Sequence, residues 1–260
     1  MNPKLIIFAG RVMDLLKSVL FLRKKMPGKI YLIPNSLGSQ DPDTFLPVKL
    51  KGLITGLKFL VVENARNARR YLKMIDHSVI INEVTFYELN KHTDPGEVHT
   101  FLQPVLDGHD LGIISEAGLP GIADPGSELV NLAHRKQIRV IPLTGPSSIF
   151  LALMASGLNG QAFRFAGYLP VQKNERIQSI KKLEKRVLDR NETQIFIETP
   201  YRNNAILDDI CAACHDQTLL TVAVDISTKT ESIKTAEIKI WKKNKPDLHK
   251  RPAVFLLGKS

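Results

Sequence analysis

The chain has 260 residues, 43% hydrophobic and 24% charged, which is enough to bury a substantial core and to form one large or, as we expect, two smaller domains. Its two cysteines, Cys211 and Cys214, exclude a disulfide framework and favour a reducing, cytoplasmic location. No apolar run approaches the about 20 residues that cross a bilayer, so the composition predicts a soluble protein rather than a membrane protein.

The charge is strongly basic, with 36 Lys and Arg against 26 Asp and Glu, a formal net charge of +10 and a pI near 9.6. Such a surplus suits a polyanionic partner. The basic residues gather at Arg66 to Lys73, at 173–190 and at 239–251. Each cluster is either a contact surface for that partner or a solvated face.

The first 25 residues carry apolar side chains at helical spacing, from Leu5 to Val19, interrupted by charged residues. This pattern predicts an amphipathic helix rather than a signal peptide. We assign residues 1–28 to an N-terminal extension. It is either an upstream extension that results from a misplaced start codon or a basic helix that binds a partner surface.

The rest of the chain alternates apolar, β-branched runs with helical patterns. Strands are expected at 30–33, 59–63, 111–115, 139–143, 194–197, 219–224, 237–241 and 253–257, and helices at 65–74, 95–107, 127–136, 149–156 and 203–213. The βαβ rhythm predicts an α/β fold with parallel or mixed sheets and ligands at the carboxyl ends of strands. A break near Thr144-Gly145-Pro146 divides it into an N-terminal domain, 29–144, and a C-terminal domain, 145–260.

The segment Ser115–Gly126 follows one of these strands and is rich in glycine and proline. Pro120 and Pro125 lack N–H groups, so the loop offers more acceptors than donors, while its glycines let the backbone approach a ligand closely. A ligand with an amino group and a positive centre suits it, and S-adenosylmethionine has both. No phosphate-binding G-x-G-x-x-G or G-x-x-x-x-G-K-[ST] occurs in the chain. The alternative is an ordinary strand-to-helix connection.

Further segments follow at characteristic separations: Thr144-Gly145-Pro146-Ser147-Ser148, Phe163 to Pro170, and Glu198-Thr199-Pro200-Tyr201-Arg202. Together with the 115–126 loop they resemble the tetrapyrrole methylase family over roughly residues 30 to 260. Within it they are most similar to the branch that methylates a cytidine 2′-hydroxyl in small-subunit ribosomal RNA. That resemblance implies two α/β lobes with S-adenosylmethionine in the cleft between them, a ribosomal RNA or small-subunit partner, and a homodimer.

The resemblance also implies which residues contact the cofactor, largely through backbone atoms. They are Pro34, Ala117, Gly118, Leu119, Ile122, Ala123, Ser147, Ser148 and Glu198. Ser147 is also the expected N-cap of helix 149–156. Glu198 and Arg202 either form a local pair beside a helix start or lie at the cofactor cleft and near an acceptor phosphate.

Glu63 and Arg66 are the candidate catalytic residues, because a 2′-hydroxyl is a poor nucleophile that benefits from a base and Glu63 ends an apolar strand. The alternative is a salt bridge between them that only fixes a helix start. Asn64 and Ala65 replace an acid and a hydroxyl of the ribosomal branch. Two other functions stay open: a tetrapyrrole C-methyltransferase, and a degenerate member that binds cofactor or RNA without turnover.

The pair Cys211 and Cys214, followed by His215, has the spacing of half a zinc site. A second ligand pair is missing from the sequence. The apolar positions of helix 203–213 predict instead that both cysteines are small core residues.

Overall fold

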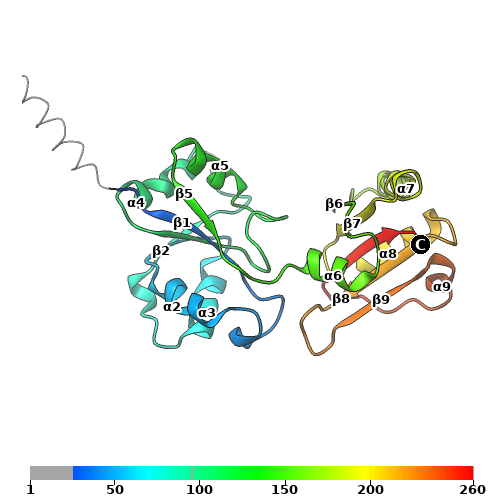
Figure 1. Ribbon diagram of the computed structural model, residues 1–260, viewed down its shortest axis with the longest axis horizontal. Helices are drawn as coiled ribbons and strands as arrows, with labels where there is room; N and C mark the ends of the chain where they lie inside the picture. Colours follow the sequence, from blue (N-terminus) through cyan, green and yellow to red (C-terminus); the bar gives the residue numbers. More distant parts are fainter. Residues whose placement is uncertain (1–25, 95, 260) are drawn as a thin grey trace, which may run out of the picture.

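The computed structural model describes residues 26–94 and 96–259, which form two α/β domains arranged along the long axis of the molecule (Figure 1). The helix expected within residues 1–25 lies outside the described residues, so the nature of that extension stays a prediction. In the described part of the chain, no helix combines the length and apolarity needed to cross a membrane.

The first domain contains a five-stranded parallel sheet in the order β3-β2-β4-β1-β5. Its strands are β1 (Lys29–Ile33), β2 (Phe59–Val62), β3 (Thr85–Glu88), β4 (Leu111–Ile114) and β5 (Arg139–Pro142). Its helices are α2 (Val48–Gly56), α3 (Ala65–Ile75), α4 (Gln103–Leu106) and α5 (Ser127–Arg135), with 3-10 turns η1 (Pro42–Thr44), η2 (Ile81–Glu83) and η3 (Val98–Leu102).

Alternating side chains of this sheet feed two hydrophobic cores. Ile33 and Leu60 pack with α2 and α3 on one face, whereas Ile30 and Val61 pack with α4 and α5 on the other. A parallel sheet covered on both faces needs apolar residues at consecutive positions, which explains the unbroken apolar run of β4. The carboxyl ends of β1, β2 and β4 therefore meet at one edge of the sheet.

The second domain contains a mixed sheet in the order β6-β7-β10-β8-β9, in which only the β6–β7 pairing is parallel. Its strands are β6 (Phe163–Tyr168), β7 (Thr193–Ile197), β8 (Leu219–Val224), β9 (Ser232–Glu237) and β10 (Ala253–Gly258). Its helices are α6 (Ser148–Ser156), α7 (Lys173–Arg190), α8 (Asn203–Ala213) and α9 (Ile238–Lys243).

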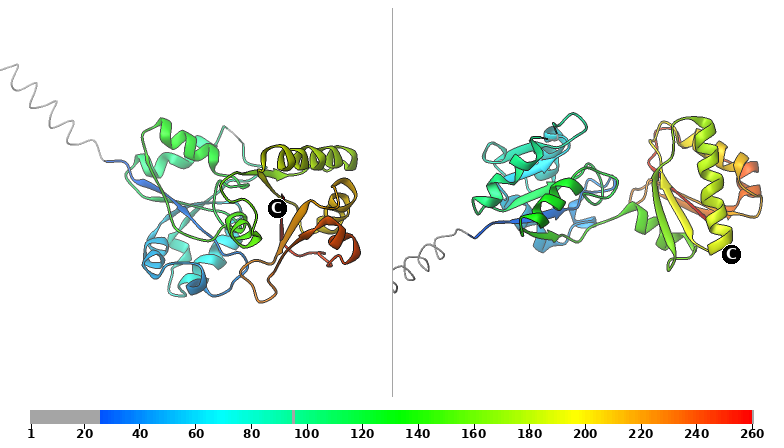
Figure 2. Two further views of the ribbon diagram at one scale, coloured as in Figure 1. Left: turned by 45° about the vertical axis from the view of Figure 1, so that its right-hand side comes forward. Right: turned by 90° about the horizontal axis from the view of Figure 1, so that it is seen from above.

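Strand β10 shows how this sheet divides its faces. Phe255 and Leu257 pack in the core formed with α7, α8 and α9, while Val254 and Leu256 pack against α6 on the opposite face. The turned views in Figure 2 show the chain leaving the first sheet and entering the second domain through α6. The division at residues 144 and 145 stays a prediction.

Two expected elements are wrong. The strand expected at 237–241 is the end of β9 followed by helix α9, because Ile238 and Trp241 are buried at helical spacing while Ile240 is exposed. The indole Nε1 of Trp241 donates to the Leu220 carbonyl at 2.9 Å. The helix expected at 95–107 is broken into η3 and the short α4. Strands β3, β6 and β9 and helices α2 and α7 were missed. Strands β3, β6 and β9 are edge strands, whose exposed positions leave a weak apolar pattern.

The junction between the domains contains a close backbone contact at Gly145. A Cβ at this position would lie 2.1 Å from the Cβ and 2.4 Å from the Cγ of Pro34. Pro34 is itself held in place, because its carbonyl accepts a 2.6 Å hydrogen bond from the buried Tyr71 hydroxyl.

We therefore expect Gly145→Ala to lower the free energy of unfolding by about 1–3 kcal/mol, the usual cost of overpacking. Urea denaturation measures this change. Gly160→Ala is the matched control, since nothing lies within 4 Å of its added Cβ. Equal stability of the two variants would contradict the tight contact at Pro34.

Candidate active site

A cavity of about 300 Å³ lies between the two domains. The 115–126 loop forms one wall, and the start of α6 with the ends of β7 and β10 forms the other. Five residues predicted to contact a cofactor line it: Ala117, Ile122, Ala123, Ser148 and Glu198. The tertiary structure thus joins segments about 80 residues apart in the chain into one site of the size that small ligands occupy.

Asn35, after β1, fixes the 115–126 loop. Its backbone N–H donates to the Gly118 carbonyl at 2.8 Å, and the Gly118 N–H donates back to the Asn35 carbonyl at 3.2 Å. The Asn35 side-chain Nδ2 also donates to the carbonyls of Ser115 at 2.9 Å and Glu116 at 3.1 Å. These bonds hold the base of the loop, while Ile122 and Ala123 at its tip remain exposed.

The loop has an unusual backbone. Gly118, Gly121 and Gly126 have φ of 68°, 78° and 114°, and Ala123 has a φ of 63°. Glycine adopts such values freely, but for alanine they cost of order 1–3 kcal/mol. Strain of this kind is concentrated at ligand sites, and Ala123 lies in the cavity wall.

Three carboxylates gather on the N-terminal side of the cavity. Asp124 and Glu116 line it, and Glu63 lies behind them, its Oε1 accepting from the Glu116 N–H at 3.2 Å. Burial, followed by the charges of Glu63 and Glu116, raises the pKa of Asp124 to about 6. Burial also raises the pKa of Glu63. This wall therefore presents concentrated negative charge, which favours a cationic ligand.

Tyr168, at the end of β6, faces these acids from the second domain. The pKa of its hydroxyl is raised by burial and then by the charges of Asp124, Glu198 and Glu63. Tyr168 lines the cavity together with Asp124 and Glu198, so acids of both walls lie in the same cavity as its hydroxyl.

Glu198, directly after β7, is the most deeply buried acid of the cavity, with a side chain 0% exposed. Its Oε1 forms an ion pair with Arg202 and accepts the Thr199 N–H at 2.6 Å. Its Oε2 has no hydrogen-bond partner among the described residues. A buried carboxylate oxygen without a donor is costly, so this atom is suited to receive a donor from a ligand.

Glu198 thus combines both sequence-based interpretations: it pairs locally with Arg202 and it lines the cavity. Thr199 is not a helix cap, because α8 begins at Asn203 with Arg202 at the N-cap position.

The other candidates lie close to the cavity without lining it. Pro34 is buried after β1, and in the 115–126 loop Gly118 is buried and Leu119 is half-buried. Ser147 occupies the N-cap position of α6, as expected, but its side chain makes no capping hydrogen bond. Arg66 is exposed on α3, and no ion pair joins it to Glu63 within the described part of the chain. The described residues therefore give no support to the alternative of a salt bridge between Glu63 and Arg66.

Sequence reasoning missed several residues of the site. Asp124 lies in the 115–126 loop and Tyr168 in the segment Phe163 to Pro170, both of which carried the family resemblance. The acidic residue directly before Pro125 could have been predicted to face the ligand. Asn35 follows the first strand and was not among the predicted site residues. The wall residues Ile226 and Pro252 carry no local signal, since only the fold brings them to the cavity.

The two cysteines are where the helical pattern placed them, buried in the core of the second domain. Burial raises the pKa of both thiols. Among residues 26–94 and 96–259, no three His, Cys, Asp or Glu side chains gather in a group that could hold a metal ion.

Solved structures with a similar fold include tetrapyrrole methyltransferases. The methyltransferase CobJ superposes with a TM-score of 0.60 at 14% identity, covering 90% of this chain and 95% of that one. Uroporphyrin-III C-methyltransferase from Thermus thermophilus, complexed with S-adenosylhomocysteine, superposes with a TM-score of 0.52 at 18% identity over 89% of this chain and 97% of that one. The predicted two-domain α/β fold of tetrapyrrole methylases is confirmed.

No model of a known protein family matches the chain. Curated relatives do. A protein of Leptospira borgpetersenii named ribosomal RNA small subunit methyltransferase I is 34% identical over 190 residues, which are 73% of this chain and 70% of that protein. One of the same name from Halalkalibacterium halodurans is 33% identical over 184 residues, 70% of this chain.

The chain belongs to the ribosomal RNA small subunit methyltransferase I family, which confirms the family and the branch expected from the motifs. The matched region spans 59% of the Halalkalibacterium protein, less than two thirds of its length.

The raised pKa of Asp124 has a consequence for stability. Because its folded-state pKa of about 6 exceeds the ordinary 3.8, the stabilising contribution of this group is fully present below about pH 3.8 and is lost as the pH rises through about 6. Above that range the ionised carboxylate opposes folding.

We therefore expect Asp124→Asn to raise the melting temperature near neutral pH, and the gain to shrink as the pH falls through about 6. Thermal melts at a series of pH values measure it. Asp189→Asn, at an exposed position of α7, is the control and should change little. A stability loss in Asp124→Asn at neutral pH would show that the carboxylate is favourably partnered.

Proposed function

We propose that this protein is an S-adenosylmethionine-dependent methyltransferase that methylates a ribose 2′-hydroxyl of small-subunit ribosomal RNA. The observation that carries the proposal is the interdomain cavity, where the strained 115–126 loop meets Ser148 and the unpartnered Oε2 of Glu198. The names of the relatives supply the substrate class.

The chain's own groups fit this cofactor. S-adenosylmethionine supplies a methyl group on a sulfonium, together with an amino group and hydroxyls. The negative charge of Glu116 and Asp124 favours the cation, and Glu198 Oε2 accepts an N–H or O–H. Ala117, Ile122, Ala123 and Ser148 contact the cofactor directly. Pro34, Gly118, Leu119 and Ser147 shape the loops from behind.

Glu63 is placed to handle the acceptor proton. The strand end holds it beside Glu116, and burial raises its pKa toward the range in which a general base is effective. Arg66, one turn along α3 and exposed, is placed for an RNA phosphate rather than for Glu63.

The surface of α3 supports an RNA partner. Arg66, Arg69 and Arg70 are exposed on it, and within the described residues none of the three forms an ion pair. Such a row of guanidinium groups suits phosphates.

We also propose a cytoplasmic homodimer. Both cysteines are free thiols, and Phe150, Met154 and Phe163 form an exposed apolar group beside the edge strand β6.

A tetrapyrrole C-methyltransferase is the second candidate, favoured by the structural likeness to such enzymes. Its polycarboxylate substrate is repelled by the acids of the cavity. A member that binds without turnover is the third.

One experiment separates the three. The protein is first titrated with S-adenosylhomocysteine by calorimetry, and then incubated with S-adenosylmethionine carrying a labelled methyl group and either small-subunit RNA or uroporphyrinogen. We expect one cofactor site per chain and label at a ribose of the RNA, located by mass mapping. Label in the tetrapyrrole favours the second candidate, and cofactor binding without label in either favours the third. No binding at all would overturn the proposal.

Glu63→Gln tests the proposed base. Loss of a general base typically slows a reaction by about 10²–10⁴-fold. We expect single-turnover methyl transfer to slow within that range, while affinity for S-adenosylhomocysteine and the melting temperature change little. Glu83→Gln, on the exposed turn η2, serves as control. A normal rate in Glu63→Gln would remove Glu63 from the reaction.

A further inference from the structure

An exposed aromatic ring lies beside the cavity on the second domain and has no part in the reaction proposed above. Tyr201 is 71% exposed and directly follows Pro200, which lines the cavity. The flat face of a tyrosine offers a large apolar area, and its hydroxyl stays in water, so an exposed ring of this kind can receive a flat partner.

The position of Tyr201 is set by a second segment, residues 249–252. The Lys250 N–H donates to the Pro200 carbonyl at 3.1 Å, and Pro252 lines the cavity next to it. Lys250 has a φ of 60°, a conformation that non-glycine residues rarely adopt. This turn brings the Lys250 Nζ to 6.0 Å from the centre of the Tyr201 ring, while the His249 ring meets it edge-on at 6.2 Å.

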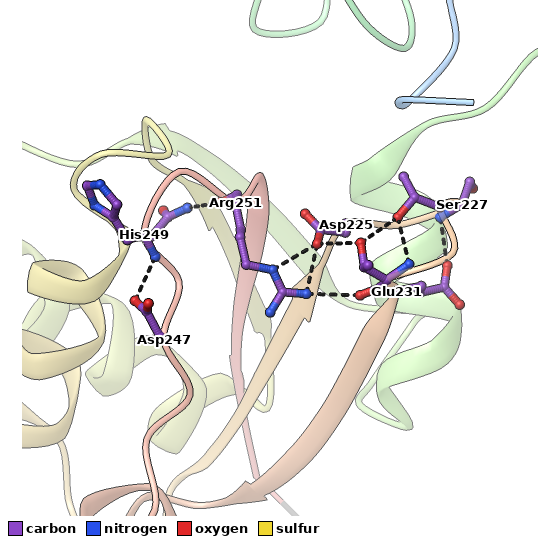
Figure 3. A network of polar contacts seen from close by, with 9 residues as sticks. Asp225, Ser227, Glu231, Asp247, His249 and Arg251 are labelled. Carbon is purple, nitrogen blue, oxygen red and sulfur yellow. Dashed lines mark hydrogen bonds and ion pairs between the residues drawn. The ribbon is translucent and has the colours of Figure 1, made fainter. Parts of the chain in front are cut away.

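Three cationic side chains lie on the two segments around the Tyr201 ring, and they differ in whether an acid neutralises them. Arg202 is paired with Glu198, and Arg251 with Asp225 at 2.8 Å. Figure 3 shows Arg251 reaching toward Asp225, while the His249 ring lies on the other side of the segment. The backbone N–H of His249 donates to the Asp247 carboxylate at 3.0 Å. Lys250 forms no ion pair with any residue in the described ranges. At 6.0 Å from the ring centre, its ammonium group is at the limit of cation–π contact. The ammonium group is therefore available to form an ion pair with a phosphate.

We propose that Tyr201 stacks an unpaired nucleobase of the RNA substrate, and that Lys250 contacts an adjoining phosphate. The inference rests on the proposed function and names the element that holds the RNA next to the reacting ribose. Proteins that recognise single-stranded RNA combine an exposed aromatic face with a neighbouring cation in this way. Because Pro200 and Pro252 line the cavity, a base on Tyr201 places its own or the next ribose at the cavity mouth.

The test uses the full-length protein with S-adenosylhomocysteine and a single-stranded RNA of about 12 nucleotides carrying one 2-aminopurine, whose fluorescence falls on stacking. A second RNA has an abasic site at that position. The variants are Tyr201→Ala, Tyr201→Phe and Lys250→Ala. Val48→Ala and Lys49→Ala are matched controls, since both residues are exposed on α2.

We expect Tyr201→Ala to weaken RNA affinity by about 5- to 100-fold and to abolish the fluorescence change. Tyr201→Phe keeps the ring and should stay within about twofold of wild type. The abasic RNA should bind the wild-type protein less tightly but lose little further affinity in Tyr201→Ala. Lys250→Ala should reduce the salt slope of binding by about one contact. Unchanged melting curves show that the variants are folded.

The proposal is overturned if Tyr201→Ala binds and quenches like wild type, if the abasic RNA binds wild type as tightly as the intact one, or if wild type does not bind the probe. It is also overturned if Tyr201→Ala changes the oligomeric state and leaves RNA affinity intact, since the ring then belongs to a protein interface. None of these outcomes decides the proposed function, which the labelled-methyl assay on small-subunit RNA tests separately.

Discussion

The site depends on how Asn35 holds the 115–126 loop. Its backbone and its side-chain amide together make four hydrogen bonds to Ser115, Glu116 and Gly118, across about 80 residues of sequence. Because the base of the loop is fixed, its tip can carry the strained Ala123 and the costly carboxylate of Asp124. A strained backbone conformation persists only where the surrounding contacts hold it in place, and the hydrogen bonds of Asn35 provide such contacts.

The two walls of the cavity have different electrostatic roles. Glu63, Glu116 and Asp124 make the first wall negative, which suits a cationic methyl donor. The overall charge of the chain is nevertheless +10, and exposed cations outside the cavity include those on α3 and the one near Tyr201. The negative charge of the cavity wall and the positive charge of the surface are thus separated in space, which is consistent with the proposed cofactor and RNA partner.

The paired acid Glu198 links these two regions. One oxygen pairs with Arg202, and the other has no hydrogen-bond partner in the part of the chain that the structure describes. Glu198 therefore lies between the cavity and the turn that carries Tyr201, and it contacts both.

The sequence by itself determined most of the strands, the two-domain order and the existence of the glycine- and proline-rich loop at 115–126, because apolar periodicity and glycine–proline punctuation are local signals. It misread 237–241, where Ile238 and Ile240 alternate like a strand although Trp241 and Ile238 are the buried pair of a helix. It found Glu198 and Ala123 through motif spacing.

Only the tertiary structure decided which residues share the cavity. Glu116, Asp124 and Tyr168 acquire their roles from neighbours that lie far away in the chain, since burial and the approach of other charges raise the pKa of Asp124 and Tyr168. The same holds for Asn35 and for the pairing of Tyr201 with Lys250. A sequence specifies which groups are present, but desolvation and charge proximity exist only once the two domains are placed side by side.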